Sequence, residues 1–187
     1  MNLAEMKKKA LALIEEYDPS EEQKTNDADI GAKLNDVINQ IMFELARIKR
    51  IPKYVEMTVK QGDVITLADI GKECGSEVYQ LAAFCGVSFV PKANGTVLKV
   101  LEDGVAEIDV YVYPERITEK TKDNAYEFEL SDDVLEIMPY GIAADLLKSD
   151  RSAEYGTIYA QRYESLKQQL DTRYQGTMIS FEGGVSI

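Results

Sequence analysis

The chain has 187 residues, of which 45% are hydrophobic, so it is long enough to bury a sizeable core. Its 33 acidic and 21 basic residues give a net charge of −12, with no basic patch along the chain. Because nucleic-acid affinity depends on clustered lysine and arginine, this composition argues against a protein that grips DNA, but not against one past which DNA slides. No apolar run approaches the ~20 residues that cross a bilayer, and we expect no secretory signal.

Two amphipathic helices are predicted before residue 52. In the first, over residues 2–17, apolar side chains recur at helical spacing, and Asp18-Pro19 ends the helix because a residue before proline disfavours the helical conformation. The second begins after the capping residue Asn26 or Asp27 and ends at "RIKRIP", where basic residues suit the negative end of the helix dipole. Its apolar stripe consists of Ile30, Leu34, Val37, Ile38, Ile41, Leu45 and Ile48.

From Tyr54 the apolar pattern changes to a period of two, which is typical of strands. "YVEMTV" and "AEIDVYVYP" alternate apolar and polar side chains, and the dipeptides Asn94-Gly95 and Asp103-Gly104 each predict a tight hairpin turn. The region therefore predicts an antiparallel sheet or a small sandwich.

Two further segments belong to this strand region. "AYEFEL" predicts a strand that directs Tyr126, Phe128 and Leu130 inward. "KECGSEVYQLAAFCG" leaves two interpretations open, since its middle part fits a short helix while the residues that follow fit a strand.

Helices are also predicted after the strands. In "SDDVLEIMPYGIAADLLKSD", Asp133 and Glu136 have the spacing of a capping box, and Pro139 suits the first turn of a second helical piece. The buried stripe of that piece is Ile142, Leu146 and Leu147.

A long last helix is predicted after Ser149-Asp150, and one of its faces is made largely of tyrosine. That face consists of Tyr155, Tyr159, Tyr163, Leu166, Leu170 and Tyr174. Tyrosine covers apolar area and keeps a polar tip, so the face suits either packing within its own bundle or contact with another subunit.

Together these elements predict an α+β fold in a single domain, residues 1–187. A helical bundle takes residues 1–52 and 131–175, a β insertion takes residues 54–130, and a C-terminal tail takes residues 176–187. The apolar residues of the tail are Met178, Ile179, Phe181, Val185 and Ile187. They suit either a frayed end or a strand that docks on the sheet edge of a partner.

The sequence offers little for catalysis. Histidine is absent, which excludes the usual Ser-His and Cys-His nucleophile systems, and Cys74 and Cys85 lack the spacing of a zinc site. "NDADIG" has the look of a calcium loop, but Ala28 and Ile30 would occupy ligand positions. Pairs of carboxylates could serve a glycosidase, but a sugar-binding cleft usually presents aromatic side chains, and tryptophan is absent from the chain. We therefore expect no enzymatic activity, no metal and no cofactor.

The order of elements resembles the head–tail connector, or adaptor, proteins of tailed bacteriophages, which are similar to the gatekeeper tail proteins of short-tailed phages. The resemblance rests on "DIGAKLNDVINQIMFELARIKR", on "EIDVYVYPERI" and on "FELSDDVLEIMPYGIAADLLKSDRSAEYGTIYAQRYESLKQQL". In that family a strand is followed by an acidic cap, a helix pair with a proline, and a long final helix. The similarity extends over most of the chain.

The resemblance implies a structural virion protein at the head–tail interface, present in the host cytoplasm during assembly. It implies a ring of about a dozen copies that joins the portal protein to a downstream tail protein, with DNA passing only as cargo and no membrane involved. The tyrosine face would carry ring or portal contacts. Two alternatives stay open: a monomeric β-sandwich binding module, and a tail structural protein that does not contact the portal.

Overall fold

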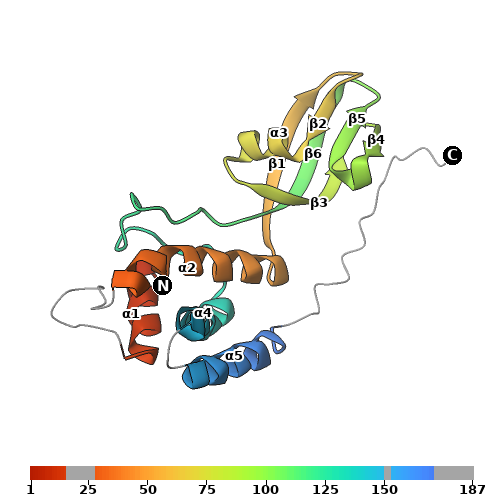
Figure 1. Ribbon diagram of the computed structural model, residues 1–187. Coiled ribbons are helices and arrows are strands. Elements are labelled where there is room, and N and C mark those ends of the chain that lie inside the picture. The colour runs from red at the N-terminus through yellow and green to blue at the C-terminus, as the bar shows by residue number, and fades with distance from the viewer. Residues whose placement is uncertain (16–27, 150–152, 171–187) are drawn as a thin grey trace. The chain divides into compact units, whose positions relative to one another are not determined.

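The fold is α+β, as the sequence predicts (Figure 1). The computed structural model describes residues 1–15, 28–149 and 153–170. The chain divides into two compact units, and the first, built from helices, combines Met1–Lys49 with Arg116–Thr172. The second unit, Arg50–Glu115, contains the strands and one helix. Compared with the predicted β insertion, residues 54–130, it begins slightly earlier and ends well before residue 130.

The helical unit is organised around α4. Its elements are α1 (Leu3–Leu13), α2 (Ala28–Ile48), α4 (Asp132–Leu146), the short 3-10 turn η2 (Leu147–Ser149) and α5 (Ala153–Lys167). Helix α4 packs against α1, α2 and α5. The apolar stripe predicted for α2 faces this core, with Leu34, Ile38, Ile41 and Leu45 buried.

Helix α1 begins with a reciprocal cap. The Asn2 side chain accepts a hydrogen bond from the Glu5 backbone N–H at 2.9 Å, and the Asn2 backbone N–H donates to the Glu5 carboxylate at 3.2 Å. Two N–H groups that lack helical partners are thereby satisfied. The helix ends at Leu13, earlier than the predicted residue 17, and the capping residues Asn26 and Asp27 predicted for α2 lie outside the described residues.

Helix α4 runs unbroken through Pro139, so the predicted division at this proline is wrong. Ser131 is the N-cap, and Asp133 lies in the first turn instead of capping it. An interior proline loses one helical hydrogen bond and costs about 3 kcal/mol. The cost is tolerated here because α4 is buried on several sides: Pro139 is buried, and Met138 and Ile142 are fully buried.

Residues 125–130 do not form the predicted strand. Tyr126, Phe128 and Leu130 are buried, as their alternation predicts, but the only ladder contact described for this segment is an isolated bridge between Asn2 and Glu127. The alternation therefore predicted correctly which side chains are buried. It predicted wrongly that they pack in a sheet, because the segment packs on helices of its own unit.

Buried polar contacts hold the connecting segment 116–125 to these helices. Asn39 of α2 is 4% exposed, and its amide both donates to the Ile117 carbonyl and accepts from the Ile117 N–H, each at 2.8 Å. Lys7 of α1, 8% exposed, forms an ion pair with Asp123 at 2.9 Å. Each pair satisfies polar groups that would otherwise be buried without partners.

The strand unit consists of two three-stranded antiparallel sheets with matching order, β1-β6-β3 and β2-β5-β4. Their bounds are β1 Ile51–Val59, β2 Val64–Thr66, β3 Val78–Cys85, β4 Phe89–Lys92, β5 Val97–Val100 and β6 Gly104–Val112. Each of three chain segments gives one strand to each sheet: β1 continues to β2, β3 to β4, and β5 to β6. The three segments lie in the same order in both sheets, and on each segment a short stretch outside the strands separates the strand of one sheet from the strand of the other.

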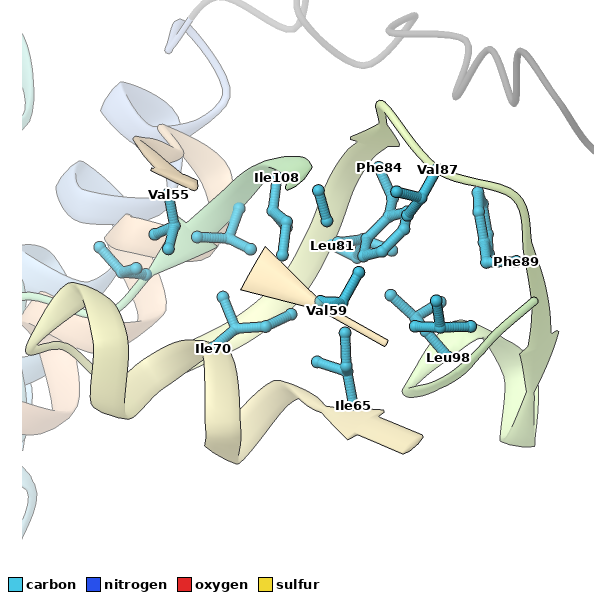
Figure 2. Packing of buried hydrophobic residues seen from close by; sticks show 14 residues of the cluster. Val55, Val59, Ile65, Ile70, Leu81, Phe84, Val87, Phe89, Leu98 and Ile108 are labelled. Carbon is cyan, nitrogen blue, oxygen red and sulfur yellow. The ribbon is translucent and has the colours of Figure 1, made fainter. Parts of the chain in front are cut away.

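One apolar cluster forms the core of this unit (Figure 2). Phe84 and Ile108 are fully buried in it, and Ile70 of helix α3 (Leu67–Cys74) completes it. Helix α3 starts with a reciprocal cap between Thr66 and Asp69 and ends at Gly75 in the left-handed conformation, φ 64°. The ambiguous segment after Gly75 is therefore a strand, β3.

Of the two predicted hairpin turns, one is confirmed. The turn η1 (Ala93–Gly95) joins β4 to β5, with Asn94 and Gly95 at positive φ. The prediction at Asp103-Gly104 is wrong, because β5 and β6 lie in different sheets. Gly104 serves packing instead: a β carbon there would lie 2.6 Å from Cγ1 of Val87.

Candidate interaction surface

Helix α5 is attached to its unit by a narrow seam. Gly156, Tyr163 and Leu170 are buried, and Tyr159 and Leu166 are half-buried between them, at steps of three and four. At Gly156 a β carbon would lie 3.2 Å from Cβ of Leu147, so the helices approach closely where the side chain is missing. Most of the remaining surface of α5 is exposed.

The predicted tyrosine face is divided between the core and solvent. Tyr155 is 63% exposed, Tyr159 is half-buried, and its hydroxyl donates to the Leu13 carbonyl at 2.5 Å, while Tyr163 is buried. Leu166 and Leu170 belong to the seam, and Tyr174 lies outside the described residues. Among the five members of the predicted set that the structure describes, Tyr155 alone therefore offers a largely exposed side chain to a partner.

Sequence reasoning missed Ile158, which is 58% exposed three residues after Tyr155. Side chains three apart lie on the same face of a helix, so the two form an apolar surface that we call the Tyr155/Ile158 patch. Gly156 is the residue that could have revealed this patch. It lies on the packed side of α5, so Tyr155 and Ile158 fall beside the seam and not within it.

Tyr163 lies at the centre of the seam, and its polar hydroxyl group is buried there. Its hydroxyl is buried and meets no hydrogen-bond partner of good geometry in the part of the chain that is described. Burial, together with the negative charge of Glu44, raises the pKa of Tyr163 well above its usual value. The Lys167 ammonium lies 4.8 Å from the ring centroid and forms ion pairs with Glu44, at 2.7 Å, and Glu164. Tyr163 is therefore neutral and structural.

Two hollows flank α5. A cavity of about 350 Å³ between α2, α4 and α5 is lined by Gly141, Gly156 and Ala160 together with Glu44 and Glu164. A larger groove of about 710 Å³ lies between α1, α4 and α5. We call it the α1/α4/α5 groove; its apolar lining includes Leu13, Ile137, Leu166 and Leu170, and Lys9 and Arg162 stand at it with two carboxylates.

The outer face of the β1-β6-β3 sheet is acidic. Glu56 lies directly opposite Glu107, and Asp109 lies opposite Tyr54, all four with exposed side chains. Like charges placed directly opposite each other are destabilising. The Tyr54 hydroxyl donates to Glu56 at 2.8 Å, and this hydrogen bond, with the nearby carboxylates, raises the pKa of Tyr54 to about 12.

The predicted docking tail, with Met178, Ile179, Phe181, Val185 and Ile187, lies outside the described residues. Across residues 1–15, 28–149 and 153–170, no group of three or more His, Cys, Asp or Glu side chains could hold a metal ion. None of the helices in those ranges combines the length and apolar character needed to cross a bilayer.

Comparisons with known proteins give no family assignment. No protein-family model matches the chain, and no curated protein matches its sequence.

Proposed function

We propose that this protein is a structural virion protein of a tailed bacteriophage, a head–tail connector that forms a ring of about a dozen copies between the portal protein and the downstream tail protein. The observation that supports the proposal most directly is the Tyr155/Ile158 patch. It lies on a helix that its own unit buries only along a narrow seam. Exposed aromatic and aliphatic side chains on one face suit a contact with another subunit.

The way in which the helical unit is built also supports the proposal. The unit combines helices from before residue 50 and after residue 115, with the strand unit between them in the sequence. This is the element order on which the resemblance to connector proteins rests. Helix α4 with Pro139 and then helix α5 follow the strands in the chain, in the order that the resemblance implies, although α4 is one unbroken helix and not a pair.

Charge is consistent with passage of DNA. The chain carries a net charge of −12, and the outer face of the β1-β6-β3 sheet gathers Glu56, Glu107 and Asp109. A negative surface repels phosphate and offers no electrostatic trap. In a ring of the proposed kind, such a face suits the wall of the channel.

The proposal is tested by native mass spectrometry of the purified full chain, alone and mixed with the portal protein of the same virus. The expected result is one portal-bound complex that carries about a dozen copies of the 21.0 kDa chain. A chain that stays monomeric and ignores the portal would overturn the proposal and favour a monomeric binding module. Rings that form without affinity for the portal would instead favour a tail protein placed elsewhere.

A further inference from the structure

We propose that the open edge of strand β1 binds an extended segment of a partner protein, which pairs with β1 as a further antiparallel strand and places lysine or arginine on the acidic outer face of the sheet. The proposal concerns the strand unit by itself, so it goes beyond ring formation and does not depend on it. Three features support it: the backbone groups of β1, the irregular opposite edge of the sheet, and the charges of the outer face.

Alternate residues of β1 direct their backbone groups away from the sheet. The N–H of Tyr113, just after β6, donates to the carbonyl of Glu77, just before β3, at 2.9 Å. Because the hydrogen-bonding direction reverses at each residue of a strand, Val112 and the other even-numbered residues of β6 face β1. Their partners in β1 are the odd-numbered residues, from Ile51 to Val59. The even-numbered residues of β1 therefore direct their backbone groups to the open edge.

The residues at the even-numbered positions agree with this direction. Pro52 has no N–H, and proline occurs in edge strands where the missing donor would face solvent. Tyr54, Glu56 and Thr58 have exposed side chains, and in the described part of the chain no backbone hydrogen bond is recorded for their N–H groups. Val55, which alternates with them, points into the core (Figure 2). A row of unpaired backbone groups of this kind is a template for another strand.

The two edges of this sheet differ in regularity. Strand β1 pairs with β6 over nine successive residues without a register shift. Strand β3, at the opposite edge, has register shifts between Val78 and Gln80 and between Leu81 and Ala83. Bulges bend an edge strand and protect it from pairing. Among the described strands, β1 therefore presents the edge that best accepts a further strand.

The charge of the outer face decides the occupant. Glu56 lies on β1, and Glu107 and Asp109 lie on the neighbouring strand β6. Arg50 adds one positive charge near the start of β1, where its guanidinium lies 4.8 Å from the ring centroid of Tyr111. A second copy paired through β1 would bring a second set of these carboxylates into one sheet, and like charges on adjacent strands are destabilising. Lysine or arginine on the added strand instead complements the carboxylates.

The probe for this site is a synthetic peptide of the length of β1 in which lysine alternates with valine. Added to the full-length protein, it should slow the exchange of the Tyr54, Glu56 and Thr58 amide protons with water several-fold, as measured by NMR. The amides of Val55 and Met57 already face β6 and should change far less. Binding without this alternation along β1 would overturn the proposal.

Two control peptides separate charge from backbone pairing. A peptide with glutamate in place of lysine should bind at least about tenfold more weakly in fluorescence anisotropy titrations. A lysine peptide that is methylated at the backbone nitrogens of its lysines keeps the charge but cannot donate to β1, and it should lose affinity to a similar extent. Equal affinity of the lysine and glutamate peptides would overturn the chemistry of the occupant. Full affinity of the methylated peptide would overturn strand addition.

Matched variants locate the site on β1. Thr58→Pro removes an outward N–H from an edge strand, where proline is tolerated, whereas Thr58→Val keeps that N–H. We expect several-fold weaker peptide binding in Thr58→Pro alone. Should Thr58→Pro disturb folding, Glu56→Gln with Asp109→Asn removes two exposed carboxylates and should weaken binding of the lysine peptide and its dependence on salt. Affinity that ignores these changes would overturn the assignment to this edge.

The free protein provides a separate check. Exchange at Tyr54, Glu56 and Thr58 should be fast and independent of protein concentration. Slow exchange that becomes fast on dilution would overturn the proposal in favour of a second copy. Slow exchange at every concentration would overturn it as well, because the edge would then be covered within the chain itself. Since every reading is made without the portal protein, failure here leaves the portal-binding test of the proposed function unaffected.

Discussion

Gly141 on α4 lies against the ring of Tyr163 on α5. A β carbon at position 141 would stand 2.9 Å from Cε2 and 3.0 Å from Cδ2 of that ring, and 3.2 Å from Cδ1 of Ile41. Three helices therefore meet at a point where only a hydrogen atom fits, and the position of the thinly buried helix α5 depends on it.

This contact predicts the sign of one substitution. In an exposed helix interior, Gly→Ala stabilises by about 1 kcal/mol. At position 141 the added methyl group must displace a buried ring, and overpacking of this kind costs about 1–3 kcal/mol. We expect Gly141→Ala to lower the free energy of unfolding, measured by urea denaturation.

Gly156→Ala is the matched control for this measurement. Its added β carbon would meet Cβ of Leu147 at 3.2 Å, a milder approach than the one at position 141. The loss should therefore be smaller than that in Gly141→Ala. A Gly141→Ala protein that is more stable than the wild type would show that α4 and α5 do not approach as described.

A second prediction concerns Asn39, whose amide is paired with both backbone groups of Ile117. Asn39→Ala leaves a buried N–H and a buried C=O without their partner, and each such group costs about 1–3 kcal/mol. We expect a loss of about 2–4 kcal/mol in the free energy of unfolding. Gln40→Ala, one residue later and exposed, should change it by less than about 0.5 kcal/mol. Equal effects of the two substitutions would contradict a specific role for Asn39.

The cap of α3 predicts a dependence on acid. Hydrogen bonds from the Thr66 side chain and from Lys72, whose ammonium lies 3.0 Å away, lower the pKa of Asp69 from 3.8 to about 2. Because the folded pKa is the lower one, the stabilising contribution of the carboxylate is present above about pH 4 and is lost as pH falls towards 2.

We therefore expect the stability difference between wild type and Asp69→Asn to shrink as pH falls from 5 to about 2. The measurement is urea unfolding at a series of pH values in this range. Glu73→Gln, an exposed change in the same helix, serves as the control and should show no comparable trend. A difference that stays constant with pH would show that the Asp69 carboxylate is not held in the cap.

Local periodicity predicted the elements whose environment is regular. The α2 stripe and the alternation of β1 and β6 were sufficient, because each of these elements buries one face and exposes the other. The same reasoning failed at Pro139, where burial by neighbouring helices outweighs the local cost of proline in α4. It failed also at residues 125–130, whose partner is a helix surface that lies far away in the sequence.

The candidate surface was only partly predictable for a related reason. The spacing of tyrosines identified one side of α5, but the packed seam is set by Gly156 and by its contact with Leu147. A residue without a side chain gives no hydrophobic signal, so Tyr155 was assigned to the packed face in place of Gly156, and Ile158 was missed. The α1/α4/α5 groove combines residues from three helices, and periodicity within one helix cannot show it.

The last prediction separates assembly from folding. Tyr155 and Ile158 are 63% and 58% exposed, so replacing both with serine removes little buried area from the isolated chain. We expect the free energy of unfolding to change by less than about 0.5 kcal/mol. If the patch is a subunit or portal contact, the double variant should bind the portal at least about tenfold more weakly in titrations followed by native mass spectrometry, because interface aromatics contribute strongly. The double variant Val64→Ser, Val105→Ser provides the matched control, since both valines are exposed in the strand unit. If portal binding and ring formation respond equally to the two double variants, the Tyr155/Ile158 patch has no specific role in assembly.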